Sequence, residues 1–319
     1  MTEQNSVVGT AGLPVPILSQ SPVTLTVPGR PVDLRLRVTA PATGTDLPVI
    51  LFSHGHGTSN HLSSLDGYAP LVNLLASRGF LVLQPSHLSS ATLRHRVGHL
   101  PEAPLFWRSR ATDMTHLLDG LAEIERAVPQ LAGRVNHGDV AVAGHSLGAS
   151  TACLLLGART TDPDTGEVVD LREPRIKQGV VLAAPGRGDV LNGPMAPLVP
   201  FARDVDFSTM TTPALVVAGD KDDSRHFTDA GPDWHADPYQ LAPGPKTLLT
   251  VFGAEHILGG ISGYDATETT DENPARVAAL AELTASYLLS AFGRDAGAWA
   301  ATCAHLTDGP DAVGRIDTK

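Results

Sequence analysis

The sequence predicts an α/β protein built around a doubly wound, mostly parallel sheet. Short apolar, β-branched runs that suit buried strands alternate with segments of helical spacing, which is typical of a parallel sheet covered by helices on both faces. Two earlier segments alternate apolar with polar residues across a Pro-Gly turn, and they predict an antiparallel N-terminal hairpin at the sheet edge. At 319 residues the chain is long enough to bury a large core, and we expect one domain over residues 21–295.

The N-terminal part begins with a polar, proline-interrupted stretch, and we expect residues 1–20 to form a flexible arm. Beyond the arm, hydrophobic periodicity and turn residues define each element. In chain order these elements are the hairpin strands 23–27 and 32–38, the buried strand 48–52, a helix over about 64–77 and the strand 80–83.

Residues 85–106 are less regular and contain three prolines together with His87, His95 and His99. Long loops within compact domains are usually functional or mobile, so we expect this His-rich loop near the active face. For the C-terminal extension, residues 296–319, we expect a short helix around Trp299 and then a polar tail. The elements between loop and extension are a helix over 107–127, the strands 140–143, 179–183, 214–218 and 246–252, and a helix over 276–292.

Composition argues against several classes of function. The chain has 23 basic and 34 acidic residues, and this net charge of −11 disfavours binding to nucleic acid or to an anionic membrane. No segment approaches the ~20 apolar residues of a membrane span, and the first residues lack the basic and apolar regions of a signal peptide. We therefore expect a cytoplasmic protein without a nucleic-acid partner and without membrane insertion. Two cysteines are too few for a disulfide framework.

The most informative stretch is residues 139–156, where a buried strand passes through the run GHSLG at 144–148 into a small-residue helix. Strand, tight turn and helix are the context of a nucleophile elbow, which holds a serine in a strained conformation. Glycine is expected at both 144 and 148 on steric grounds, because a side chain at either position would collide with the neighbouring strand or helix. Ser146 is the predicted nucleophile, and an ordinary glycine-rich turn is the alternative.

A serine hydroxyl needs a base that takes its proton, and the base needs a third group that orients it. In this kind of sheet the acid and then the histidine should follow the serine along the chain, at the carboxyl ends of later strands. The strand 214–218 ends in GDKDD, which offers Asp220, Asp222 and Asp223 as the acid. The strand 246–252 ends in GAEH, so the predicted base is His256.

Ester hydrolysis also needs donors for the oxyanion that forms in the transition state, and backbone N–H groups of glycine-rich turns supply them. The first expected donor is the N–H of Leu147, directly after the nucleophile. The strand 48–52 runs into an H-G-x-G turn at 54–57, where we expect the N–H of His56 as the second donor, with Gly57 as its nearest competitor.

The histidines of this turn raise a metal alternative, because H-x-H after a strand has the spacing of metal ligands. However, Thr58 and Ser59 stand where a metallo-hydrolase of the H-x-H-x-D-H type would need Asp and His. We therefore expect no metal site. His145, inside the elbow, is expected to be a packed or hydrogen-bonded neighbour of the reacting groups.

These motifs together resemble the α/β-hydrolase superfamily, and within it the serine esterases grouped around platelet-activating-factor acetylhydrolases, chlorophyllases and bacterial polyester hydrolases. The resemblance covers roughly residues 30–292. Two positions depart from the usual pattern: Ala149 stands where many relatives have another glycine, and His56 replaces a more usual apolar or aromatic residue. The motifs that carry the resemblance are FSHGHG at 52–57, GHSLG at 144–148, PALVVAGDKD at 213–222 and GAEH at 253–256.

The resemblance implies an α/β-hydrolase fold that needs neither a metal nor an organic cofactor. It implies Ser146 as the nucleophile, His256 as the base and Asp222, rather than Asp220, as the orienting acid. The N–H groups of His56 and Leu147 would then form the oxyanion hole.

The resulting hypothesis is a carboxylic-ester hydrolase that acts through an acyl-enzyme on small-molecule esters, either short to medium or aryl and bulky ones. About 28 residues separate Pro185 from Pro213, which is short for a large cap domain, so we expect an open cleft. Candidate apolar wall residues are Trp107, Leu258 and Ile261, each of which could equally belong to the core. The alternatives are a lactonase, amidase, acyltransferase or cofactor-free perhydrolase with the same triad, or a non-catalytic binding protein on this scaffold.

Overall fold

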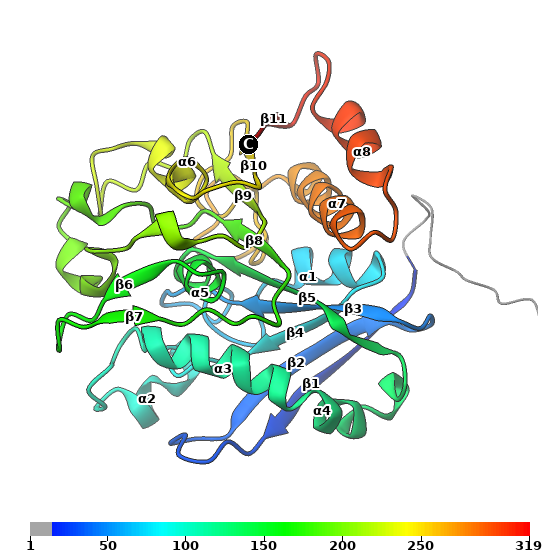
Figure 1. Ribbon diagram of the computed structural model, residues 1–319, viewed down its shortest axis with the longest axis horizontal. Helices are drawn as coiled ribbons and strands as arrows, with labels where there is room; N and C mark the ends of the chain where they lie inside the picture. The colour runs from blue at the N-terminus through cyan, green and yellow to red at the C-terminus, as the bar shows by residue number, and fades with distance from the viewer. Residues whose placement is uncertain (1–14) are drawn as a thin grey trace, which may run out of the picture.

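The computed structural model describes residues 15–319, so most of the predicted N-terminal arm, residues 1–14, lies outside the described part. Nine strands form one sheet in the order β1-β2-β4-β3-β5-β8-β9-β10-β11, and β6 (Arg159–Thr161) pairs with β7 (Val168–Asp170) separately (Figure 1). The strands of the large sheet are β1 (Ile17–Leu25), β2 (Leu34–Pro41), β3 (Leu47–Ser53), β4 (Leu81–Pro85), β5 (Val135–His145), β8 (Gln178–Leu182), β9 (Ala214–Gly219), β10 (Lys246–Val251) and β11 (Gly314–Thr318).

The centre of this sheet is parallel from β4 through β3, β5, β8 and β9 to β10. The hairpin of β1 and β2 is antiparallel, and β2 also pairs antiparallel with β4. This arrangement confirms the predicted doubly wound sheet with an antiparallel N-terminal hairpin. Its physical basis is visible in β3, where every residue is buried, because successive side chains enter the cores on opposite faces of the sheet.

Two helical layers cover the sheet. On one face α1 (Ala69–Ser77) and α7 (Pro274–Ala291) pack over alternate β3 residues such as Ile50 and Phe52. On the other face α3 (Trp107–Asp119), α4 (Leu121–Ala127) and α5 (Leu147–Leu155) pack over Val49 and Leu51. The helix α8 (Ala298–Leu306) lies against α7 (Figure 1), and it is the short helix expected around Trp299.

Two predicted helices have different bounds in the structure. The helix expected from residue 64 begins at Ala69, because Tyr68 adopts a left-handed conformation with φ 64° and Pro70 occupies the first turn. The helix expected over 107–127 is divided at Gly120 into α3 and α4. A side chain at this glycine would be crowded, since a Cβ there would lie 2.9 Å from a methyl group of Leu25 and 3.1 Å from the carbonyl oxygen of His116.

Both ends of the chain contribute more to the sheet than the sequence predicts. β1 starts at Ile17, so residues 17–20 belong to the hairpin and not to the arm. Residues 314–318, expected in a polar tail, form β11, which pairs antiparallel with β10. Charged residues on this short strand make it resemble a tail in sequence, although such residues are common on edge strands.

The connections near the carboxyl ends of the strands are irregular. Residues 183–213, between β8 and β9, form four short 3-10 turns, and the segment contains no helix of the length that a large cap domain has. The His-rich loop contains only one turn of α-helix, α2 (Arg94–Val97). A further short helix, α6 (Asp237–Leu241), precedes β10.

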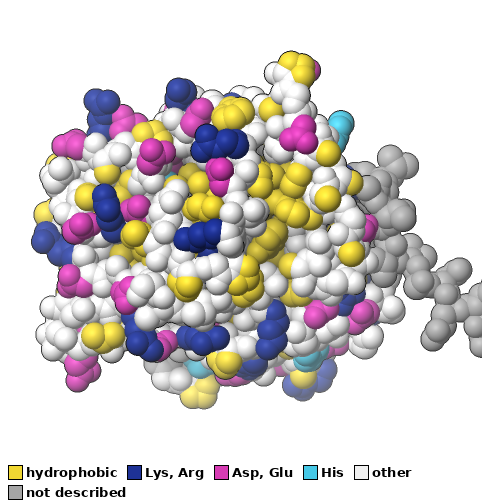
Figure 2. Space-filling model, turned by 45° about the horizontal axis from the view of Figure 1, so that its top comes forward, with side chains coloured by type: hydrophobic (Ala, Val, Ile, Leu, Met, Phe, Trp, Pro, Cys, Tyr) yellow, Lys and Arg dark blue, Asp and Glu magenta, His cyan; other side chains and the backbone are white. Residues whose placement is uncertain are grey.

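The surface carries charges of both signs. Figure 2 shows one face, on which basic and acidic side chains are interspersed around a band of apolar side chains. The net charge of −11 is therefore not gathered into a single acidic patch on this face. Among the helices of the described chain, none is long and apolar enough to cross a membrane.

Candidate active site

Ser146 occupies the turn between β5 and α5, with a strained backbone conformation of φ 55° and ψ −120°. Its N–H donates to the carbonyl of Leu182 at 3.0 Å, which holds the turn against β8. A Cβ on Gly144 would lie 2.1 Å from the carbonyl oxygen of Gly148, and one on Gly148 would lie 2.0 Å from that of Ser53. Glycine is therefore required at both positions for the strand, turn and helix to pack this closely.

Three side chains from distant parts of the chain meet at this turn. The Oγ of Ser146 lies 2.9 Å from Nε2 of His256, and Nδ1 of His256 lies 2.8 Å from Oδ2 of Asp222. An ionised carboxylate only accepts hydrogen bonds, so Nδ1 carries the proton in a neutral ring and Nε2 presents its lone pair to the hydroxyl. This arrangement can accept the serine proton. The His256 side chain is 33% exposed and that of Asp222 is 2% exposed, so the site opens to solvent on the imidazole side.

Only one of the three candidate aspartates faces this imidazole. Asp220 accepts the N–H of Gly253 at 2.7 Å and thereby braces the loops after β9 and β10, while Asp223 pairs with Arg225 on the surface. Burial by itself would raise the pKa of Asp222. The opposing charge and hydrogen bonds of the two neighbouring histidines outweigh burial and hold this pKa well below its usual value.

The second of these histidines, His235, was not predicted from the sequence. Its Nε2 lies 3.2 Å from Oδ2 of Asp222 and 3.0 Å from Oγ of Ser224, and its Nδ1 lies 2.7 Å from the carbonyl of Ala184. The Ser224 hydroxyl donates to the other carboxylate oxygen of Asp222. His235 comes from a 3-10 turn at 232–236 and not from a strand end, so no motif marks it in the sequence.

His145 is fully buried beside the reacting groups, where burial and the neighbouring charge of His256 lower its pKa to about 3. The neutral ring donates from Nε2 to the carbonyl of His256 at 2.8 Å and accepts from the Tyr68 hydroxyl at 2.9 Å. The Tyr68 hydroxyl in turn accepts the N–H of Gly55. His145 thus connects the base loop to the glycine-rich turn after β3, as a hydrogen-bonded neighbour and not a reactant.

Comparison with known families identifies the family of the chain. A model of the alpha/beta hydrolase family matches residues 50–314, which include Ser146, Asp222 and His256. The chain belongs to the alpha/beta hydrolase family. A search among curated proteins found no match.

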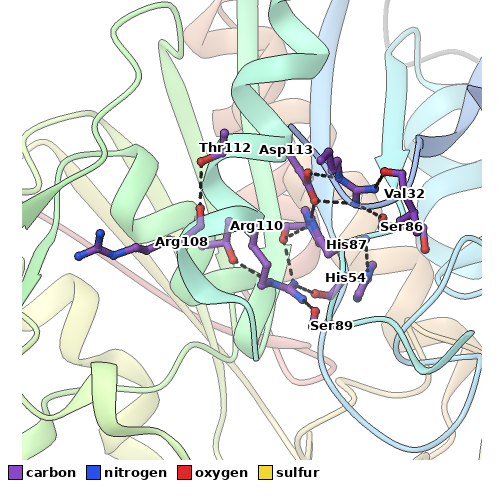
Figure 3. Close-up of polar contacts among 12 residues, drawn as sticks. Val32, His54, Ser86, His87, Ser89, Arg108, Arg110, Thr112 and Asp113 are labelled. Atoms are coloured by element: carbon purple, nitrogen blue, oxygen red, sulfur yellow. Dashed lines mark hydrogen bonds and ion pairs between the residues drawn. The ribbon is translucent and has the colours of Figure 1, made fainter. Parts of the chain in front are cut away.

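In this hydrolase a buried guanidinium supports the turn after β3 (Figure 3). Arg110, on α3, is completely buried. It donates to Oγ of Ser53 and to the carbonyl oxygen of His54, the next residue along the chain. It also donates to Oγ of Ser89 at 2.5 Å and to Oγ1 of Thr151 at 3.0 Å. Arg110 therefore joins the β3 turn, the His-rich loop and α5. Burial lowers its pKa to about 9, so the group is still charged at neutral pH.

A second layer of polar groups holds His54 in a single tautomer. His54 accepts the N–H of His87 at Nε2, so Nδ1 carries the proton and donates to the carbonyl of Gly55 at 2.6 Å. The His87 ring contacts Oδ2 of Asp113 at 2.9 Å, and Asp113 also pairs with Arg30 (Figure 3). Buried hydrogen bonds thus hold the backbone of the turn after β3 in place.

This support leaves the two predicted oxyanion donors available. Within residues 15–319, neither the N–H of His56 nor that of Leu147 has a protein acceptor. The turn after β3 lies directly against the start of α5, as the close approach of Gly148 to the Ser53 carbonyl shows. Both groups are thus free to donate to a bound molecule.

The three predicted wall residues differ in their positions. Leu258 and Ile261 are fully buried in the core under α7, so they do not line a cleft, and this part of the prediction is wrong. The apolar residues that follow His256 therefore belong to the core and not to a substrate-binding surface. Trp107 lies in a small apolar cluster with Leu147 and stacks on Phe201 at 5.7 Å, which keeps it beside the elbow.

A metal-like grouping overlaps the site. Asp222, His235 and His256 form the only group of three or more histidine, cysteine or acidic residues in the described chain whose possible ligand atoms all lie within 4.8 Å of one another. Their separations of 2.8 and 3.2 Å are those of hydrogen bonds, and the Nδ1 proton of His256 occupies the shorter one. These three residues are therefore arranged to orient the imidazole of His256 by hydrogen bonds. His54, His56 and His61 do not form such a grouping in the described chain.

Proposed function

We propose that this hydrolase is a serine carboxylic-ester hydrolase. The observation that carries the proposal is the hydrogen-bonded chain from Ser146 through His256 to Asp222, next to two unpaired backbone N–H groups. Serine becomes a nucleophile only with such a base, and a base works best when a carboxylate fixes its tautomer. The motifs shared with serine esterases of the platelet-activating-factor acetylhydrolase, chlorophyllase and polyester hydrolase group support esters as the substrates.

The mechanism is two-step acyl transfer. His256 takes the proton of Ser146 as its Oγ attacks the ester carbonyl, and the N–H groups of His56 and Leu147 stabilise the oxyanion. The protonated imidazole then gives its proton to the alcohol as the C–O bond breaks. Water, activated by the same imidazole, attacks the acyl-enzyme and releases the acid. Asp222 stays ionised throughout and stabilises the imidazolium.

The proposal is tested with a panel of p-nitrophenyl esters, aliphatic esters, lactones and amides, assayed with wild-type protein and with Ser146→Ala. We expect turnover of esters by the wild type and none by Ser146→Ala, with the variant folded by circular dichroism. Turnover of lactones or amides in place of esters would reassign the reaction while keeping the triad. Equal turnover by wild type and Ser146→Ala would overturn the proposal.

A further inference from the structure

A cavity of about 260 Å³ adjoins the proposed oxyanion hole. It lies between the turn after β3 and the His-rich loop, and His56 forms part of its wall. The rest of the wall has apolar side chains, among them Leu88, Val97 and Phe106, and three polar ones, Ser89, Ser90 and Arg94. The volume suits the chain of a small ester.

Positive charge is concentrated at this cavity, although the protein as a whole is acidic. Arg94 is exposed at the cavity wall and makes no ion pair or side-chain hydrogen bond within the described chain. The buried charge of Arg110 lies behind the same wall, because its guanidinium donates to the hydroxyl of Ser89. Residues 85–106 contain two arginines and only one acidic residue, Glu102.

A buried polar atom in the wall also lacks a partner. Nδ1 of His56 is shielded from solvent and has no hydrogen bond with any described residue. Burial and the charges of Arg110 and Arg94 lower the pKa of His56 to about 4, although a contact of the ring with the backbone of Ser89 acts in the opposite direction. The ring is therefore neutral at neutral pH, and Arg94 is the charged group. Buried nitrogens without a partner are rare, and this one belongs to a side chain that forms part of the cavity wall.

We propose that the natural substrate is an ester with a carboxylate at the end of a short apolar chain, bound with the chain in this cavity and the carboxylate at Arg94. Guanidinium is suited to carboxylate because its fork can donate two parallel hydrogen bonds. The inference rests on the proposed function, since it places the reacting ester at the hydroxyl of Ser146 and the N–H of His56.

The test compares matched ester pairs that differ only in a terminal carboxylate against a terminal carboxamide. One pair carries the group on the acyl chain, as in p-nitrophenyl hemiesters of glutaric acid, and the other carries it on the alcohol. For each pair kcat/KM is measured for wild type, Arg94→Gln and Arg96→Gln. Arg96 is the matched control, because it is exposed on the same turn of α2 but does not line the cavity.

We expect the wild type to prefer the carboxylate in at least one pair by about tenfold, as one charge-assisted contact supplies. Arg94→Gln should lower this preference about tenfold, Arg96→Gln should keep it, and added salt should weaken it. The inference is overturned if the wild type shows no preference for the carboxylate in either pair, or if Arg94→Gln and Arg96→Gln change this preference equally. Turnover of the carboxamide ester in such a case would leave the esterase proposal standing. Hydrolysis of no ester at all would remove both.

Discussion

At the scale of single residues, the contacts of Asp222 separate it from the other aspartates of its loop. In Asp222→Asn the amide would favour the wrong His256 tautomer, so we expect kcat for an ester to fall by about 10⁴-fold. Asp220→Asn is the matched control, because Asp220 braces Gly253 and does not touch the imidazole. We expect it to keep kcat within a few-fold of wild type. A larger loss in Asp220→Asn than in Asp222→Asn would show that the acid is wrongly assigned.

The low pKa of Asp222 also affects how the stability of the protein depends on pH. Because its pKa is lower in the folded protein than the ~3.9 of an unfolded chain, the stability that it contributes is present above about pH 4 and is lost below. Asp222 therefore does not titrate between pH 5 and 8. We therefore expect chemical denaturation to show that the wild type loses stability as the pH falls below about 4, and that Asp222→Asn lacks this part of the loss. An equal loss in wild type and Asp222→Asn would contradict the low pKa of Asp222.

At the scale of elements, Arg110 joins the segments that carry both proposed oxyanion donors. Its loss in Arg110→Met would leave the Ser53 hydroxyl and the His54 carbonyl without their donor in a buried site, so we expect about 2–5 kcal/mol less stability. We also expect kcat to fall at least tenfold, since the turn that holds His56 is no longer fixed.

Chemical denaturation and ester turnover measure the two effects of Arg110→Met. Arg108→Met is the control, because Arg108 lies on the same helix but pairs with Asp162 away from the turn. Wild-type kcat in folded Arg110→Met would show that this guanidinium does not support the oxyanion turn.

Elements were predictable where local sequence determines them. The central strands could be predicted because short apolar runs that contain β-branched residues, such as Val140–Ala143, are typical of buried strands. The late start at Ala69, the break at Gly120 and the strand β11 were missed, because each depends on contacts with distant segments. A charged edge strand of five residues has no apolar pattern of its own.

At the scale of the whole molecule, parallel strands end at one edge of the sheet, and this explains why candidate site residues could be predicted from chain order. Ser146, Asp222 and His256 each follow a recognisable strand, and the structure places them in hydrogen-bond contact. The supporting groups His235 and Arg110 could not be named, because neither follows a strand end and their contacts exist only after folding. Leu258 and Ile261 were misplaced for a related reason, since apolar residues after the base suit a core as well as a wall.

The central claim is that Ser146 is a nucleophile activated by His256. The most direct measurement is reaction of the folded protein with a fluorophosphonate, followed by mass spectrometry of its peptides. We predict one stoichiometric label on Ser146 in the wild type, no label in Ser146→Ala, and labelling slowed at least 10³-fold in folded His256→Ala. An unlabelled Ser146 in folded wild-type protein, or equally fast labelling without His256, would contradict the account.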